Sequence, residues 1–170
     1  MPELTTRILG ETDEPLHLHT ATEHRAVVLA MASQAKRSVC IYTRALNPAV
    51  YDSAELAEAV SQLVRRSRHA QVRVLVQDTA RAVREGHALL RLAQQLPSKV
   101  QVRVPGPDHQ DDGQAFFVAD VAGFIRRPVA ELYAGEANFH APFTARKLLQ
   151  YFEEVWERAS PDPDVRRLFL

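Results

Sequence analysis

The sequence from Ser38 to Asp78 decides the fold. It reads Ser-Val-Cys-Ile-Tyr-Thr-Arg over residues 38–44 and Gln-Val-Arg-Val-Leu-Val-Gln-Asp over residues 71–78, with a helical pattern between the two runs. Short apolar, β-branched runs predict strands, and a helix is the usual crossover between parallel neighbours. This part of the chain therefore predicts a β-α-β unit.

The crossover helix has a clear start signal. We expect Asp52 to accept a hydrogen bond from the backbone three residues on, with Glu55 reaching back, as in a capping box. The apolar residues that follow share one helical face, which we expect to pack on the sheet: Leu56, Val60, Leu63 and Val64.

Helices and strands continue to alternate along the rest of the chain. Residues 1–19 lack a clear period and predict a loosely held segment with a short strand at 16–19. Another capping box, Thr20 to Glu23, opens a helix that ends near Arg37. The later elements are predicted as a loop at 44–51, a break at 78–85, a helix at 87–96, a strand at 99–104 beside 71–77, a loop at 105–113, a hairpin of 115–120 with 123–128, and a helix with Pro142 in its first turn and its apolar face at 145–156.

Composition indicates an ordinary water-soluble domain. The 170 residues are 46% hydrophobic and 25% charged, with a formal net charge of zero, so no overall field attracts nucleic acid or an acidic membrane. No run approaches the roughly 18 apolar residues of a membrane span. Cys40 is the only cysteine, which excludes an internal disulfide and favours a reduced thiol. We therefore expect a cytoplasmic protein.

This order of elements resembles one phospholipase-D-like domain from about Thr20 to Ala159. The resemblance rests on Ile41-Tyr-Thr-Arg-Ala-Leu46, Val72-Arg-Val-Leu-Val76, Phe117-Val-Ala-Asp120 and the helix from Ala145 to Trp156. It implies a single α/β domain with an αβα arrangement and a mixed, largely parallel sheet. It divides the chain into a leading segment (1–19), the phospholipase-D-like domain (20–159) and a C-terminal tail (160–170). It is most similar to an uncharacterised bacterial branch, found alone or attached to acetyltransferase domains.

The resemblance also implies which catalytic residues to look for. In the family, a His-x-Lys pair and a following Asp supply the nucleophile and the phosphate contacts, and a Gly-Ser-x-Asn element adds further contacts. If Asp120 is that Asp, Gly113 takes the His position and Ala115 the Lys position, and no His-x-Lys occurs elsewhere. Gly135-Glu-Ala-Asn138 is similar to the last element, whereas strict spacing from Asp120 selects Arg127, Pro128 and Ala130 instead.

The carboxyl ends of the predicted strands give a candidate ligand site, because open α/β sheets bind ligands there. This rule gathers Arg44 and Asp78 near the loop 105–113, with Thr43 and Gln77 beside them. Arg126, Arg127 and Asn138 are neighbours in this hypothesis. A guanidinium at a strand end can clamp phosphate or carboxylate. Alternatively, Arg44 pairs with Asp78 or Asp52 and fixes the loop.

Histidines and charge clusters offer further candidates, each with a structural alternative. His87 could meet a ligand in the same cleft, or it could be a helix-start residue bonded to the loop above. His17 and His19 could chelate a metal with His24 or His140, or be solvated. An acidic loop could bind a hard cation or form a solvated turn; it contains Asp108, Asp111 and Asp112. A basic cluster could contact nucleic acid or simply suit the C-terminus of a helix; it contains Arg65, Arg66 and Arg68.

These observations favour a non-catalytic binding or interaction module for a small anionic or phosphate-bearing ligand, held by Arg44, Asp78, His87, Arg126 and Asn138. The alternative is a phosphate-ester hydrolase that uses His87 or His109. We expect no cofactor, no metal, no membrane and no nucleic acid. The resemblance implies a homodimer, and the apolar end Leu168-Phe-Leu170 gives a second reason for self-association.

Overall fold

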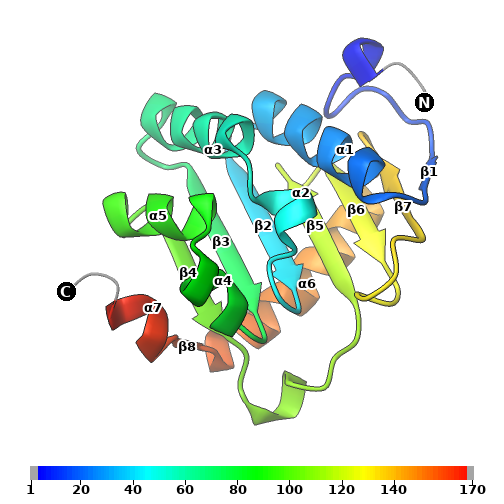
Figure 1. The fold of residues 1–170 in the computed structure, drawn as a ribbon. Coiled ribbons are helices and arrows are strands. Elements are labelled where there is room, and N and C mark those ends of the chain that lie inside the picture. The colour runs from blue at the N-terminus through cyan, green and yellow to red at the C-terminus, as the bar shows by residue number, and fades with distance from the viewer. Residues whose placement is uncertain (1–3, 168–170) are drawn as a thin grey trace.

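An eight-stranded mixed sheet forms the middle layer of the protein (Figure 1). The structure is a computed structural model and describes residues 4–167. The strands are β1 (Leu16–Leu18), β2 (Ser38–Thr43), β3 (Gln71–Val76), β4 (Val100–Val104), β5 (Ala115–Ala119), β6 (Gly123–Arg127), β7 (Gly135–Asn138) and β8 (Ser160–Pro161). Their order across the sheet is β1-β7-β6-β5-β2-β3-β4-β8. This arrangement confirms the predicted α/β class.

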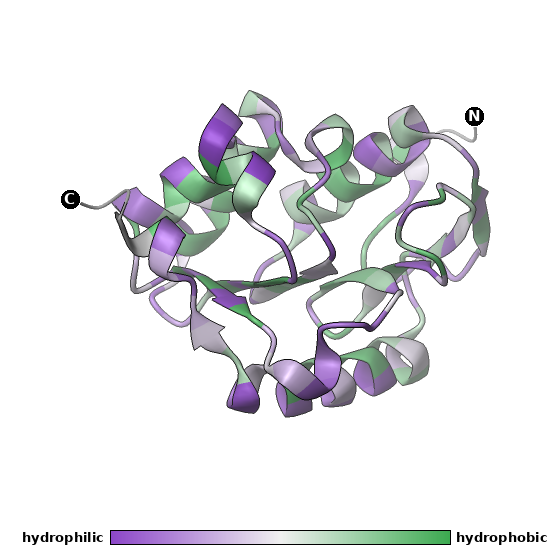
Figure 2. Ribbon diagram, turned by 60° about the horizontal axis from the view of Figure 1, so that its bottom comes forward, coloured by the Kyte–Doolittle hydropathy of each residue, from purple (hydrophilic) through white to green (hydrophobic). Residues whose placement is uncertain are grey.

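Helices cover both faces of the sheet. One layer contains α1 (Ala21–Gln34), α2 (Pro48–Tyr51), α3 (Ala54–Arg66), α4 (Ala80–Glu85) and α5 (Ala88–Gln95). The long helix α6 (Pro142–Arg158) lies alone on the other face, and Figure 2 shows the sheet between the two layers. Two 3-10 turns, η1 (Leu4–Thr6) and η2 (Pro107–His109), and the short helix α7 (Pro163–Arg167) complete the described chain. None of these helices combines the length and apolarity needed to cross a bilayer.

The β2–α3–β3 unit forms as the sequence predicts. β2 and β3 are parallel and pair from Ser38 with Gln71 to Thr43 with Val76. Val39 and Ile41 join the larger core under α1 and α3, whereas Cys40 and Tyr42 join a second core under α6. Because β2 is buried on both faces, its sequence is a continuous apolar run and does not alternate.

Two short helices and one cap differ from the expectations. Ser53, not Asp52, caps α3, and its hydroxyl accepts from the Leu56 N–H at 3.1 Å. Asp52 ends α2, and its carboxylate accepts from the Ala88 N–H at the start of α5, 2.9 Å away. The predicted Asp52–Glu55 capping box is therefore wrong, because a tertiary contact takes the Asp52 side chain. α2 and α4 occupy the predicted loop and break, since helices this short show no apolar period.

The sheet is mixed, as predicted, but the expectation that it is largely parallel is wrong. Only β2–β3 and β3–β4 are parallel among the seven neighbouring pairs. Helical crossovers connect β2 to β3 and β3 to β4, as parallel neighbours require. The antiparallel neighbours β5, β6 and β7 are connected by a tight turn at residues 120–122 and a loop at residues 128–134. The predicted pairing of 99–104 with 71–77 and the hairpin of 115–120 with 123–128 are both confirmed.

The proposed division at residues 19 and 160 stays a prediction. Both flanking segments add an edge strand to the sheet, β1 beside β7 and β8 beside β4. Val165 of α7 is buried in the larger core. The apolar end Leu168-Phe-Leu170 lies outside the described residues.

Asp120 fastens the turn between β5 and β6 to the start of β2. Its carboxylate accepts three backbone hydrogen bonds, from Lys36 (2.8 Å), Arg37 (2.7 Å) and Ser38 (3.0 Å). Its own N–H donates to the Ser38 carbonyl at 3.0 Å, and its φ of 58° lies in the left-handed region. This is the Asp that the family resemblance selects.

We expect Asp120→Asn to lower the free energy of unfolding by about 2 kcal/mol, because an amide replaces one of the accepting oxygens with a donor. Asn tolerates the left-handed backbone, so the change isolates the lost hydrogen bonds. Urea denaturation measures the effect. Asp111→Asn, at an exposed position of the loop before β5, is the matched control and should change stability by less than about 0.5 kcal/mol. Equal losses in both variants would contradict the role of Asp120.

Candidate anion-binding cleft

A cleft of about 300 Å³ opens at the carboxyl end of β2. Its walls come from the β2–α2 loop, the start of α4, the end of β6 and the β6–β7 loop. Tyr42 pairs with Phe116, and Ala115 pairs with Arg127, so Thr43 and Arg127 lie on either side of Ala115 across three strands. The polar and charged residues that line the cleft are Thr43, Arg44, Asn47, Arg81, Arg127, Glu131 and Tyr133.

Arg127 is the unusual member of this group. Its side chain belongs to a residue that is only 5% exposed, and it makes no hydrogen bond or ion pair with any residue that the structure describes. Its guanidinium lies over the ring of Tyr133, 5.7 Å from the centroid. A cation–π contact stabilises by about 1–2 kcal/mol. None of the Arg127 nitrogens is among the fully buried side-chain atoms that lack a hydrogen-bond partner, so the guanidinium is accessible from the cleft that it lines. It can therefore pair with an anion that enters the cleft.

Two hydroxyl groups in the cleft can donate hydrogen bonds to such an anion. Thr43 is 2% exposed, and its side chain has no hydrogen-bond partner within residues 4–167. The hydroxyl of Tyr133 accepts from the Asn47 amide at 2.8 Å, which leaves its own proton free. The inner part of the cleft thus offers a guanidinium and two hydroxyl groups that can donate hydrogen bonds to an oxyanion.

The mouth of the cleft carries two arginines that are already paired. Arg44 Nε lies 3.4 Å from Glu131 Oε1, and both side chains are about half exposed. Arg81 pairs with Glu85 one turn further along α4, at 3.1 Å. The structure therefore gives Arg44 an ion-pair partner other than Asp78 or Asp52, the alternatives that the sequence suggested. Exposed pairs of this kind stabilise by about 0–1 kcal/mol.

His87 and Asp78 have structural roles beside the cleft. His87 is 1% exposed and caps α5: Nδ1 accepts from the Leu89 N–H and Nε2 lies against the Leu46 carbonyl, each at 3.1 Å. This is the structural alternative named for His87, and burial lowers the pKa of the imidazole. The Asp78 carboxylate accepts from the Ala80 N–H at 3.0 Å, at the start of α4.

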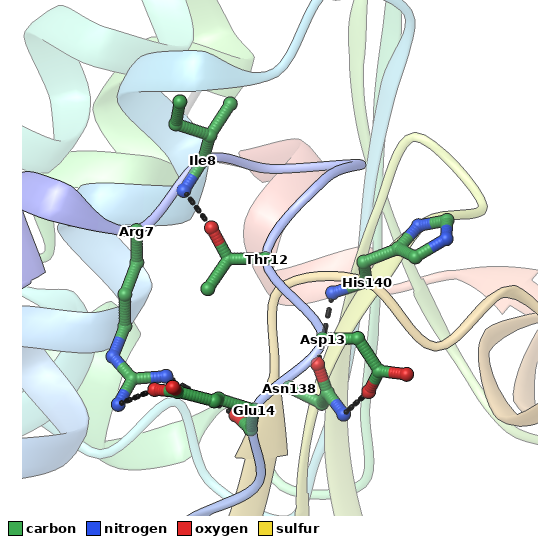
Figure 3. A network of polar contacts seen from close by, with 7 residues as sticks. All are labelled: Arg7, Ile8, Thr12, Asp13, Glu14, Asn138 and His140. Carbon is green, nitrogen blue, oxygen red and sulfur yellow. Dashed lines mark hydrogen bonds and ion pairs between the residues drawn. The ribbon is translucent and has the colours of Figure 1, made fainter.

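The other two predicted ligand residues lie away from the cleft. Asn138 is at the far end of β7, where it donates to Asp13 at 2.9 Å and accepts from the His140 N–H at 3.0 Å (Figure 3). Arg126 precedes Arg127 on β6 and so points to the α6 face of the sheet. Of the five residues grouped from the sequence, only Arg44 lines the cleft.

Strict spacing from Asp120 gives a better signal than the Gly-Glu-Ala-Asn motif. It selects Arg127, Pro128 and Ala130, of which Arg127 and Ala130 line the cleft. The Ala130 N–H also donates to the Gly113 carbonyl at 2.7 Å, which brings the family's His position next to the β6–β7 loop. The sequence did not mark Asn47, Arg81, Glu131 or Tyr133 as site residues, because their positions depend on loops and on the short helix α4, which shows no apolar period.

His109 and the metal candidates do not contribute to this cleft. The His109 ring meets Tyr151 of α6 edge-on, with centroids 5.9 Å apart. Asp112 of the same loop accepts from the hydroxyls of Tyr42, at 2.7 Å, and Tyr151. Within residues 4–167, no group of three or more His, Cys, Asp or Glu side chains is placed to hold a metal ion.

The architecture is that of phospholipase-D-like proteins. The protein superposes on Nuc, a phospholipase D family member from Salmonella typhimurium, with a TM-score of 0.59 and 15% identity, covering 88% of this chain and 99% of Nuc. The phosphatidylserine synthase of Haemophilus influenzae Rd KW20 gives 0.59 and 12%, over 91% and 40%. TrmBL2, described as an archaeal chromatin protein with a novel mode of DNA binding, gives 0.65 and 12%, over 87% and 53%. At these identities the likeness defines the fold alone.

The sequence identifies the family to which the chain belongs. Residues 20–168 match the model of the family described as Domain of unknown function (DUF7931), and the chain belongs to that family. No protein of curated function matches the sequence.

Two buried histidines predict how stability depends on pH. Burial lowers the pKa of both His24 and His87 below the usual value near 6.5. As the pH falls below 6.5, the unfolded chain binds protons that the folded chain does not, so folding stability is complete above pH 6.5 and decreases below it. The loss is at most about 1.4 kcal/mol per histidine and pH unit.

We expect the drop in unfolding free energy between pH 7.5 and 5.5 to be smaller in His87→Asn, since Asn keeps a capping oxygen but does not titrate. Urea denaturation at both pH values provides the comparison. His69→Asn, at an exposed position, should leave the drop unchanged. An identical drop in wild type and His87→Asn would show that His87 does not remain neutral in the fold.

Proposed function

We propose that this protein is a non-catalytic phospholipase-D-like domain that binds a small anionic, phosphate-bearing ligand in the cleft. The observation that carries this proposal is Arg127, a buried guanidinium that faces the cleft without an acceptor among the described residues. An oxyanion at this point would pair with Arg127 and accept from the hydroxyls of Thr43 and Tyr133. The buried charge would then contribute to binding rather than only reduce stability.

The absence of the nucleophile supports a binding role over phosphodiester cleavage. The chain contains no His-x-Lys, and Gly113 and Ala115 occupy the positions where the resemblance would place that pair. His87 is poorly placed to act as the nucleophile instead, because both of its ring nitrogens already make hydrogen bonds and burial lowers its pKa. His109 lies against Tyr151 in the α6 layer. We assign the chain to a bacterial branch of the superfamily that lacks the catalytic motif.

The partners expected for this domain follow from charge and surface. A net charge of zero favours a small ligand over DNA, although TrmBL2 is described as a DNA-binding protein. Val129 and Leu132 are 46% and 57% exposed on the loop that forms one cleft wall. This apolar surface suits a homodimer. The expected association with acetyltransferase domains and the cytoplasmic location also remain proposals.

Replacing Arg127 tests the ligand site, because the substitution should have opposite effects on stability and on ligand binding. Arg127→Met removes an unpaired buried charge, so we expect the ligand-free protein to keep its stability or gain about 1 kcal/mol. Phosphate should raise the melting temperature of the wild type, compared with sodium chloride of equal ionic strength, and should not raise that of Arg127→Met.

Arg126→Met is the matched control, because Arg126 lies on the same strand but faces the other layer. It should retain the full phosphate shift. A shift that survives in Arg127→Met, or that disappears equally in Arg126→Met, would exclude the cleft as the binding site.

Hydrolysis assays test the non-catalytic assignment. Incubation with bis(p-nitrophenyl) phosphate should give no p-nitrophenol above the buffer rate, because no described imidazole is free to attack phosphorus in the cleft. Turnover that is lost in His87→Ala or His109→Ala would instead establish the alternative, a phosphate-ester hydrolase with non-standard residues. Turnover that persists in both variants would indicate a contaminating enzyme.

A further inference from the structure

Among the residues that the structure describes, the cleft contains one arginine without an ion-pair partner and two arginines that are already paired. Arg127 has no carboxylate partner among the described residues, whereas Arg44 pairs with Glu131 and Arg81 pairs with Glu85. The unpaired arginine is buried, and the two paired ones are exposed by about half or more. A ligand with a single negative charge would satisfy Arg127 and leave both outer pairs unchanged.

The carboxylate of Glu131 already pairs with Arg44 at the mouth of the cleft. It belongs to the β6–β7 loop, and it reaches across the cleft to Arg44 at the end of β2. The contact is a single one to Nε, at 3.4 Å, and not a bidentate fork. Such a pair between half-exposed side chains is easily exchanged for another anion.

The backbone that carries Glu131 is held in place, so only its side chain needs to move. Ala130 donates to the Gly113 carbonyl at 2.7 Å, and Leu132 donates to Val129 at 3.0 Å. On the other side of Glu131, the Tyr133 carbonyl lies 2.6 Å from Nε2 of the buried His24. A rotation of the Glu131 side chain would free Arg44 without opening the loop.

We propose that the ligand carries two adjacent anionic groups, as a diphosphate does, and that the second group displaces Glu131 from Arg44. This inference rests on the proposed function of the cleft and names its ligand class. The first group pairs with Arg127 inside the cleft, and the second pairs with Arg44 at the mouth. Glu131 acts as a tethered competitor at high effective concentration.

Selectivity follows from this competition. An anion held only at Arg127 experiences the negative charge of Glu131 and gains nothing from Arg44. An anion with a second charged group gains the Arg44 contact and removes the repulsion. Glu131 therefore lowers the affinity for every anion, but a diphosphate regains part of this loss.

Calorimetric titration with orthophosphate and pyrophosphate, without divalent cations, tests the inference. The wild type should bind pyrophosphate at least about tenfold more tightly than orthophosphate. Arg44→Met should reduce this ratio at least about threefold, because the second group loses its partner. Glu131→Gln should tighten pyrophosphate binding at least about threefold. Glu157→Gln, an exposed carboxylate of α6, controls for the change in net charge and should have no such effect.

The outcomes separate this inference from the function on which it rests. If neither anion binds the wild type, or if both bind Arg127→Met as tightly, the anion-binding function itself fails. If both anions require Arg127 but the ratio is unchanged in Arg44→Met and pyrophosphate affinity is unchanged in Glu131→Gln, the site binds one anionic group and only the diphosphate inference is overturned. Because Arg44 and Glu131 are half exposed, neither substitution removes a core contact.

Discussion

The carboxylate of Asp120 joins the two halves of the sheet. β2, β3 and β4 form the parallel half through helical crossovers, and β5, β6 and β7 form the antiparallel half through turns. Asp120 binds three consecutive backbone N–H groups where α1 gives way to β2. Without Asp120, these donors would have to bond to water at the junction. One side chain thus ties the turn after β5 to the start of β2 and supports the register in which the two strands pair.

That register creates the cleft. It places Thr43, Ala115 and Arg127 in a row across β2, β5 and β6, with loops on both sides. In a phospholipase-D-like enzyme, the resemblance would put a lysine at the position of Ala115. Here an alanine occupies that position, and the cations come from strand ends and from α4. The fold is shared, whereas the cationic side chains of the cleft come from other positions of the chain.

The buried polar groups of the protein divide into satisfied and unsatisfied ones. His24 and His87 are bonded to backbone groups and serve the fold. Arg127 and Thr43 have no such partners among the described residues. A fold optimised only for stability would not keep an unpaired buried guanidinium, since an apolar residue there would cost less. Other buried side-chain atoms also lack a hydrogen-bond partner among the described residues, namely Gln77 Oε1, His109 Nδ1, Arg126 Nε and His140 Nδ1. Arg127 and Thr43 differ from these in that both line the cleft at the ends of β2 and β6.

The sequence by itself determined the β-α-β unit, the hairpin and the long last helix, because local apolar periodicity and turn residues specify them. It also showed that the His-x-Lys pair is absent. Only the tertiary structure decided that Ser53 caps α3, that five of the seven pairings are antiparallel, and that Arg44 meets Glu131. Asn138 and Arg126 left the predicted site because strand register and side-chain alternation direct them elsewhere. Which polar groups find partners depends on contacts between distant segments, and local patterns carry no information about those.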